Sequence, residues 1–502
     1  MLSQAADVRG WNGVPTGIGP DDSGYWPDPM ASPARLARSL PAQTLLLAAV
    51  LFLYHLALQR WMTTSGERLG RIGAQMVAPL HAEVDVRIGL WLVPALVVLG
   101  SFLILARRLI LRTAPPAGVL LAVSVVYFIV IGLSVAMIDA QEVKGKPRQP
   151  IIEPYSRTEW EYYGDVPTVD RVGGPASFLA RYARPRLFTT LSLHAQTHPP
   201  GAVLFLWLVS KAFGYNLWSA SLATVAFTAL IVFPVFGLAR ELAGEAVARC
   251  ALAFLLVAPN LVMFTTTSMD GPFSVLPVTS VYLFYRALGG SRPAVYAALC
   301  GLALAGAAFM TYAAVFIALF YAVVAVLDRD RFAAVARTLA VALAAFLAAY
   351  ALLFVTTGYE PVAAARAAMA HDAEMMGTGH ESFTRYLNLS VANLLVFLIG
   401  VGVPLTTCWL RELAVVAGRR LGAGDVFVVA FSVSLVLIAF SSLFTLEVER
   451  IWLLVVPFVA IAAARQAVEL MKTTGRAFSF DWVAGLTALQ LVVFEALLQT
   501  AW

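Results

Sequence analysis

The stretch Leu193-His194-Ala195-Gln196-Thr197-His198-Pro199-Pro200-Gly201 runs directly into an apolar segment at residues 202–213. The quoted stretch lies in the second half of residues 159–214, the longest passage of the chain that is too polar, aromatic and acidic to lie in lipid. The segment 202–213 has about a dozen residues, too few to cross a bilayer and typical of a re-entrant or surface helix. Pro199 and Pro200 stop a helix from continuing through His198 and set the direction in which the chain enters that surface helix. The sequence therefore predicts a loop at a membrane surface, around which membrane-spanning helices are arranged.

The composition supports this interpretation. Of the 502 residues, 60% are hydrophobic and only 13% are charged, which is typical of a polytopic membrane protein. The net charge of +5 comes with arginines in short clusters between apolar runs, as in loops that follow the positive-inside rule, so no nucleic-acid role follows. Three cysteines (Cys250, Cys300 and Cys408) lie in or beside apolar segments without the spacing of a metal site.

Apolar runs predict an all-α polytopic membrane protein, because a span needs about 20 mostly apolar residues. We expect about 13 spans on this criterion. They are residues 43–60, 88–106, 117–138, 216–239, 246–268, 272–288, 293–309, 312–328, 333–357, 390–410, 425–445, 451–468 and 482–500.

Basic residues between the spans predict the topology, since cytoplasmic loops carry an excess of Lys and Arg. Placing the basic clusters inside puts the N-terminus in the cytoplasm and makes the polar loops at 139–201, 268–271, 358–389 and 447–450 share one external face. The predicted divisions are a cytoplasmic tail at 1–42, N-terminal spans at 43–138, an external catalytic loop with its surface helix at 139–215, core spans at 216–357, an external loop or lid at 358–389, and C-terminal spans at 390–502.

The external loop contains a candidate general base. Asp165 follows Glu161, Tyr162 and Tyr163 at a glycine-containing turn, and tyrosine rings suit stacking on a sugar face. A carboxylate at this position could remove a proton from an acceptor hydroxyl as it attacks an activated carbon. The alternative is that these are ordinary acids of a solvated loop.

The two histidines of the opening stretch, His194 and His198, leave three roles open. They could ligate a metal, form hydrogen bonds to a phosphate or sugar, or serve structure alone. Asp270 either caps the helix beginning at Pro272 or points into a site as a second acid that binds a metal or orients the acceptor.

Three ionisable residues, Glu447, Glu449 and Arg450, lie tightly between two apolar spans, where charge is costly and often functional. Arg450 suits a phosphate because its guanidinium donates two hydrogen bonds at once, although an Arg–Glu pair could simply close the turn. The loop 358–389, with His371, Asp372 and glycines at 377 and 379, could form a lid.

These motifs together resemble the C-type glycosyltransferase superfamily, which includes the protein O-mannosyltransferases and the bacterial aminoarabinose transferase acting on lipid A. The points of contact run in the family's order across about residues 139–465. They are the long acidic external loop, Thr197-His198-Pro199-Pro200-Gly201 with residues 204–214, Met269-Asp270, Met310-Thr311-Tyr312, and Glu449-Arg450-Ile451-Trp452 before Pro457.

The resemblance implies a sugar donor on a polyprenyl phosphate, a catalytic external loop and inversion at the anomeric carbon. Carried over by position, Asp165 or a nearby acid is the base, Asp270 is the second-loop acid, and Arg450 with His194 or His198 binds phosphate. The family's acid usually follows its span closely, which is the position of Asp139, so Asp139 is a rival base. No second acid lies two residues from Asp270, which argues against a firmly held divalent metal such as Mg²⁺ or Mn²⁺.

The predicted protein is thus a bacterial inner-membrane glycosyltransferase with an external active site. Its partners are a polyprenyl-phosphate sugar, a glycan, lipid or protein acceptor, and membrane lipids. The enzyme alternative is a polymerase or ligase of lipid-linked glycans. The non-enzyme alternative is a flippase or transporter, which should place its ionisable residues near mid-membrane on broken helices rather than at one face.

Overall fold

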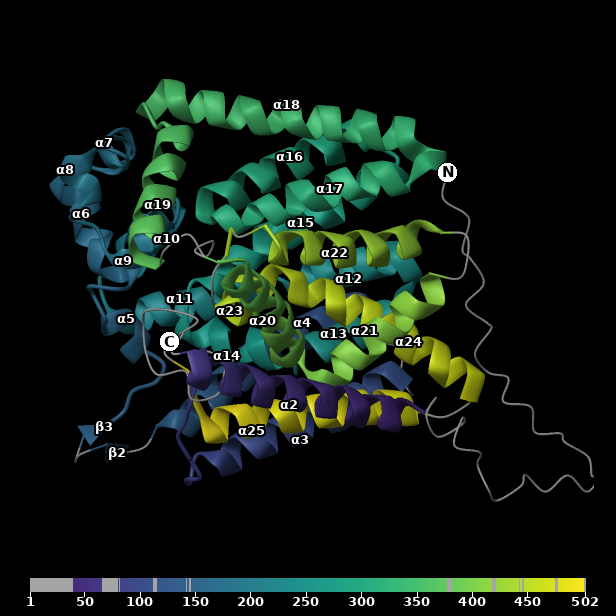
Figure 1. Cartoon of the computed structure of the whole chain (residues 1–502). Helices are drawn as coiled ribbons and strands as arrows, with labels where there is room; N and C mark the ends of the chain where they lie inside the picture. Colours follow the sequence, from purple (N-terminus) through teal and green to yellow (C-terminus); the bar gives the residue numbers. More distant parts are fainter. Residues whose placement is uncertain are drawn as a thin grey trace, which may run out of the picture.

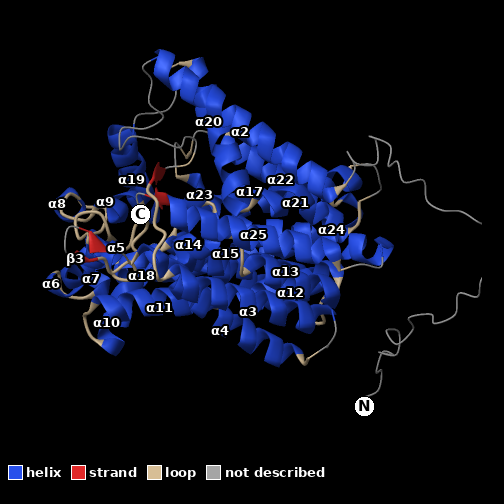
Figure 2. Ribbon diagram, turned by 90° about the horizontal axis from the view of Figure 1, so that it is seen from below, coloured by secondary structure: helices blue, strands red, loops and turns tan. Residues whose placement is uncertain are grey.

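The computed structural model describes residues 39–65, 80, 82–111, 115–140, 142–143, 146–376, 382–417, 421–441, 443–444, 447–474 and 477–500. Long helices lie side by side along one direction, and short helices gather at one end of this bundle (Figure 1). A second view shows the same segregation (Figure 2). The predicted all-α membrane architecture is confirmed.

Among the described residues, eight helical segments are long and apolar enough to cross a membrane. They are α2 (Leu40–Ser65), α4 (Ala117–Ala136) with η1 (Met137–Asp139), α11 (Leu217–Ala229) with α12 (Val232–Ala243), α16 (Pro293–Met310), η4 (Arg329–Arg331) with α18 (Phe332–Thr357), α20 (Phe383–Val401), η5 (Leu453–Val455) with α24 (Val456–Thr474), and α25 (Phe478–Leu497). A ninth would be α13 (Glu245–Leu255) with α14 (Pro259–Thr267), a pair bent by 55°.

The predicted count of about 13 spans is therefore not confirmed. Within the predicted span 246–268, a proline at the start of α14 accompanies the bend. The predicted span 390–410 is two helices, because Gly402, with φ of +112°, separates α20 from α21 (Val403–Val416). The remaining predicted spans, which are not among these eight or nine candidate membrane-spanning segments, are also helical. They are α3 (Leu92–Leu111), α15 (Asp270–Gly289), η3 (Tyr312–Ala314) with α17 (Val315–Leu327), and α22 (Ala423–Ala439).

Helix packing in the bundle depends on small residues and buried aromatic rings. Gly301 of α16 faces α18 so closely that a Cβ there would lie 2.7 Å from the carbonyl carbon of Ala342. Phe427, Phe431 and Phe458 cluster between α22 and α24, with ring centroids 5.4–6.1 Å apart. Close backbone approach and aromatic packing are what hold helices together where lipid removes the hydrophobic drive.

The loop between α4 and α11 folds into short helices rather than an extended coil. Prolines lie in the first turn of several of them, where the missing amide costs no hydrogen bond. These helices are α5 (Glu153–Ser156), η2 (Tyr162–Asp165), α6 (Val166–Arg171), α7 (Pro175–Arg181), α8 (Pro185–Phe188), α9 (Leu193–Thr197) and α10 (Gly201–Phe213). As predicted, His198 is extended and α10 begins directly after the two prolines.

Two further elements complete this end of the bundle. α19 (Pro361–Met376) follows α18, which ends at left-handed Gly358, and the single turn α23 (Val448–Ile451) precedes η5. The strands are short antiparallel pairs, β1 (Ala82–Val84) with β4 (Leu498–Thr500) and β2 (Glu142–Val143) with β3 (Lys146–Pro147).

Candidate active site

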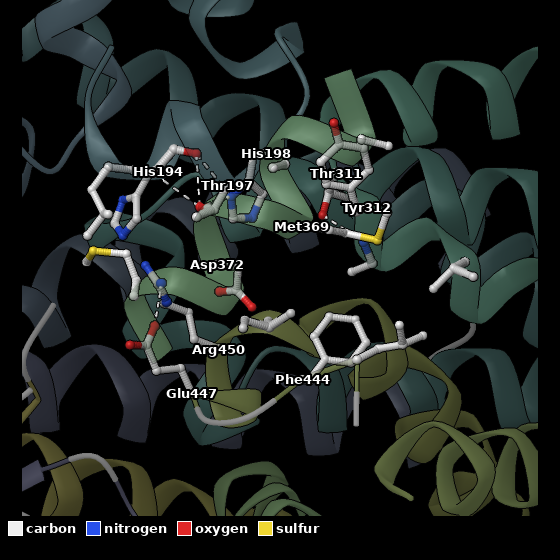
Figure 3. Close-up of a pocket in the computed structure, with 18 residues that line it drawn as sticks. His194, Thr197, His198, Thr311, Tyr312, Met369, Asp372, Phe444, Glu447 and Arg450 are labelled. Atoms are coloured by element: carbon white, nitrogen blue, oxygen red, sulfur yellow. Dashed lines mark hydrogen bonds and ion pairs between the residues drawn. The ribbon is translucent and has the colours of Figure 1, made fainter. Parts of the chain in front are cut away.

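A cavity of about 360 Å³ opens where α9, α19, α23 and η3 meet. One part of its wall is polar and the rest is apolar (Figure 3). The polar lining residues are His194, Thr197, His198, Thr311, Tyr312, Asp372, Glu447 and Arg450, and the apolar ones include Met369, Met375, Leu443, Phe444 and Ile451. Residues from three of the four predicted external loops line this cavity directly, and the fourth loop reaches it through Asp270.

Arg450 of α23 is the cation of the cavity wall. Its Nη2 lies 2.8 Å from Oε2 of Glu447, and its Nε lies 3.3 Å from Oδ2 of Asp270. Burial alone would lower the pKa of Arg450, but Asp270, Glu447 and Glu161 raise it above its ordinary value. The guanidinium is therefore held charged while only 5% of the residue is exposed.

Asp270 is the first residue of α15, and Met269 occupies the capping position, so the capping interpretation of Asp270 is wrong. The Ser268 hydroxyl donates to Asp270 Oδ2 at 2.9 Å, which orients the carboxylate toward Arg450. Glu447 has φ of +63°, an uncommon conformation for a residue with a side chain, and it brings the Glu447 carboxylate onto the cavity wall.

The histidines form the opposite side of the polar wall. Glu161 Oε1 lies 3.3 Å from His194 Nδ1, and the ring of Tyr162 lies 5.6 Å from that of His194 and 5.8 Å from that of His198. The Tyr182 hydroxyl lies within hydrogen-bond distance of the carbonyls of Ala195 and His198, which fixes the turn after α9. The two histidines thus line the cavity, as Glu447 and Arg450 do on the other side, and Glu161 and Tyr162 contact the histidines from behind.

His198 is neutral at physiological pH, because burial lowers its pKa to about 4. Its Nδ1 lies 3.2 Å from both the carbonyl oxygen of His194 and the hydroxyl of Thr197, so this nitrogen is engaged within the turn. A neutral imidazole adds no positive charge for a phosphate. We therefore expect His198 to contact hydroxyl groups.

Asp372 also lines the cavity, although the sequence placed it only in a lid. It lies on α19 in register with Ala365, Met369 and Met375, a spacing of three to four residues that puts these side chains on one helical face. An acid on an otherwise apolar face was the signal that could have found it. Burial raises the pKa of Asp372, and the nearby Glu447 adds to this effect.

Asp165, the predicted base, does not line the cavity. It is buried at the start of α6, where its Oδ2 accepts a hydrogen bond of 2.9 Å from the backbone amide of Ser192. Burial raises its pKa, and the hydrogen bonds of Ser192 oppose this. The neighbouring Tyr163 stacks on Tyr215 with ring centroids 4.5 Å apart, outside the cavity lining.

Asp139, the rival base, lies at a second and much smaller cavity of about 40 Å³. Its Oδ1 accepts from Arg87 Nη1 at 2.8 Å and from Arg148 Nη1 at 2.9 Å. Glu449 likewise turns away from the main cavity, toward a small cavity shared with Asn260, whose side chain donates to the Glu449 carbonyl. The sequence could not show these directions, because they depend on how the loops pack.

The residues present do not form an evident metal site. Within the described ranges, no group of three or more His, Cys, Asp or Glu side chains is arranged to hold a metal ion. The Asp270 carboxylate is engaged by Ser268 and Arg450 instead. The predicted lid residues at 377–381 lie outside the described part of the chain.

Comparisons with known proteins identify related sequences and folds. Residues 197–356, about a third of the chain, match the sequence model of the dolichyl-phosphate-mannose-protein mannosyltransferase family. A search among curated proteins returns no match.

Among solved structures, the oligosaccharyltransferase of Archaeoglobus fulgidus in complex with Zn and sulfate is similar at 12% identity and a TM-score of 0.46, over 74% of this chain and 53% of that one. The same archaeal enzyme with an inhibitory peptide and a dolichol-phosphate gives 11% identity, a TM-score of 0.45 and coverage of 75% and 55%. The chain therefore spans just over half the length of the solved structures it matches.

The family match begins at Thr197 and contains three of the motifs quoted above, which are the His-Pro-Pro turn, Met269-Asp270 and Met310-Thr311-Tyr312. Of these residues, His198, Thr311 and Tyr312 line the cavity. It covers the central part of the region in which the motifs were found. The predicted resemblance is confirmed by this match over residues 197–356, in which the chain is similar to the mannosyltransferase family.

Proposed function

We propose that the chain transfers a sugar from a polyprenyl phosphate to an acceptor hydroxyl, with inversion at the anomeric carbon, in the cavity between α9, α19 and α23. The observation that carries this proposal is Arg450, a buried and charged guanidinium that lines the cavity. A lipid phosphate is a leaving group that needs positive charge as its bond to the sugar breaks. Where water is scarce, one fixed guanidinium supplies more stabilisation than it would in bulk water.

The composition of the wall suits such a donor. Phe444 lies on the cavity wall on the same side as Arg450, and Met369 of α19 lies across from it (Figure 3). The apolar side chains of Leu443, Ile451 and Met375 also line the cavity. A phosphate at Arg450 would leave the prenyl chain against these apolar side chains and the sugar toward the histidines. His194 and His198, with Thr197, then offer hydrogen-bonding groups for sugar hydroxyls.

The proposed location is the inner membrane of a bacterium, with the N-terminus in the cytoplasm and the cavity on the external side. This orientation follows from the positive-inside rule, by which loops rich in Lys and Arg lie in the cytoplasm. If successive spans cross the membrane in opposite directions, the basic loops lie at the end of the bundle opposite the cavity. The acceptor is proposed to be a glycan, lipid or protein that reaches the cavity from that external side.

The test is transfer of radiolabelled sugar from a panel of polyprenyl-phosphate donors by purified protein in liposomes. We compare the wild type with Arg450→Lys and with Arg148→Lys, which lies at the small cavity. Lysine keeps the charge but loses the two-pronged donor, so we expect Arg450→Lys to lower kcat/KM by about 100-fold, while Arg148→Lys stays near the wild type. Absence of transfer from every donor, with lipid-linked substrate still crossing the bilayer, would instead identify a flippase.

A further inference from the structure

We propose that Asp372 of α19 is the general base of the transfer reaction. This inference rests on the proposed function and adds to it the residue that activates the acceptor. The structure presents the Asp372 carboxylate to the cavity between the histidines on one side and the Arg450–Glu447 pair on the other (Figure 3). A base must reach the proton that it removes, and the predicted bases Asp139 and Asp165 do not line this cavity.

The choice among the acids follows from their contacts. Only Asp372 and Glu447 bring a carboxylate to the described cavity wall. Glu447 is paired with Arg450 at 2.8 Å, so its carboxylate is already engaged by a cation. Glu161 reaches the cavity only through His194, and Asp270 only through Arg450.

Asp372 differs from these acids. Within the described part of the chain, no hydrogen bond or ion pair is seen to its carboxylate, which is only partly exposed. The charged and titratable groups around it are His371 on its own helix, His194 and His198 beside α9, and Glu447 and Arg450 at α23. Burial raises the pKa of this carboxylate, and no fixed cation pairs with it among the described residues, so it is suited to accept a proton from an acceptor bound in the cavity.

The proposed step balances without another reactant. As the acceptor oxygen forms its bond to the anomeric carbon, the acceptor proton moves to the Asp372 carboxylate. The bond between that carbon and the phosphate oxygen breaks, and its electron pair stays on the phosphate beside Arg450. The products are the glycosylated acceptor and the polyprenyl phosphate, and Asp372 later releases its proton to water.

The test compares Asp372→Asn and Asp372→Glu with a matched control on the same helix, Glu374→Gln, whose residue is exposed and does not line the cavity. With the best donor of the panel, kcat and KM are measured from pH 5 to pH 9 in liposomes. We expect Asp372→Asn to lower kcat by about 100-fold or more, with KM for the donor within about twofold of the wild type. The acid limb of the wild-type profile, in which activity falls as Asp372 becomes protonated, should disappear.

Asp372→Glu and Glu374→Gln keep the assignment of Asp372 as the base testable if Asp372→Asn folds poorly. Asp372→Glu retains a carboxylate and should keep an acid limb with reduced kcat, and Glu374→Gln should behave as the wild type. If Asp372→Asn keeps both the wild-type kcat and the acid limb, Asp372 is not the base, although the glycosyltransfer itself stands. If the wild type transfers sugar from no donor, the proposed function fails, and this assignment fails with it.

Discussion

At the scale of single residues, Arg450 explains why so many acids lie near one point. Asp270 and Glu447 both form ion pairs with Arg450, and Glu161 also raises its pKa, so removing the guanidinium would take away the cation that Asp270 and Glu447 share. Breaking such a buried pair typically costs about 3–5 kcal/mol of stability. This is why lysine, which preserves the charge, is the informative replacement at position 450.

His198 makes a pH-dependent prediction. Its folded-state pKa of about 4 lies below the ordinary value of 6.5, so between these values the unfolded chain binds a proton that the folded chain does not. The stability that His198 contributes is therefore complete above pH 6.5 and is lost as the pH falls toward 4. In detergent, the melting temperature of the wild type should fall more between pH 7 and pH 5 than that of His198→Asn. An equal fall in both proteins would show that His198 titrates normally.

At the scale of elements, the start of α10 is fixed by a close approach to the end of α16. A Cβ at Gly201 would lie 2.8 Å from the carbonyl carbon of Phe309 and 2.9 Å from the sulfur of Met310. The contact joins the His-Pro-Pro turn to Thr311 and Tyr312 on the cavity wall. Glycine is needed here so that the two backbones can approach.

Gly201→Ala should therefore move α9 and α10 away from η3, lowering stability by about 1–3 kcal/mol and reducing transfer activity. The matched control is Gly485→Ala in α25, where a Cβ meets nothing within 4 Å and alanine should be neutral or favourable by up to about 1 kcal/mol. Melting temperature and transfer rate are measured for both variants. Similar behaviour of the two variants would contradict the close approach at Gly201.

At the scale of the whole molecule, the sequence predicted the architecture and part of the site, and it failed where direction mattered. Apolar runs identified the membrane-spanning helices of the described chain but not α19, which was predicted as part of a loop. The ordered motifs included His194, His198, Asp270 and Arg450, which the fold brings together. The predicted number of spans is not confirmed, because hydropathy does not reveal bends such as the one before α14. Asp165 and Asp139 turn away because loop packing, which no local pattern encodes, decides where a carboxylate points.

The proposed orientation makes a labelling prediction. The native cysteines Cys250, Cys300 and Cys408 are fully buried, so introduced cysteines report without background. In intact cells, a membrane-impermeant maleimide should label Ser156→Cys, at the end of α5, but not Ser291→Cys, between α15 and α16. Both positions are exposed in the structure. Labelling of Ser291→Cys alone would invert the topology.

The most direct measurement is an experimental structure of the protein with bound polyprenyl phosphate. We expect the phosphate within hydrogen-bond distance of the Arg450 guanidinium, with the prenyl chain along Phe444 and Met369. A phosphate held instead by Arg87 and Arg148, at the small cavity of Asp139, would contradict the central claim and move the site of transfer to that cavity.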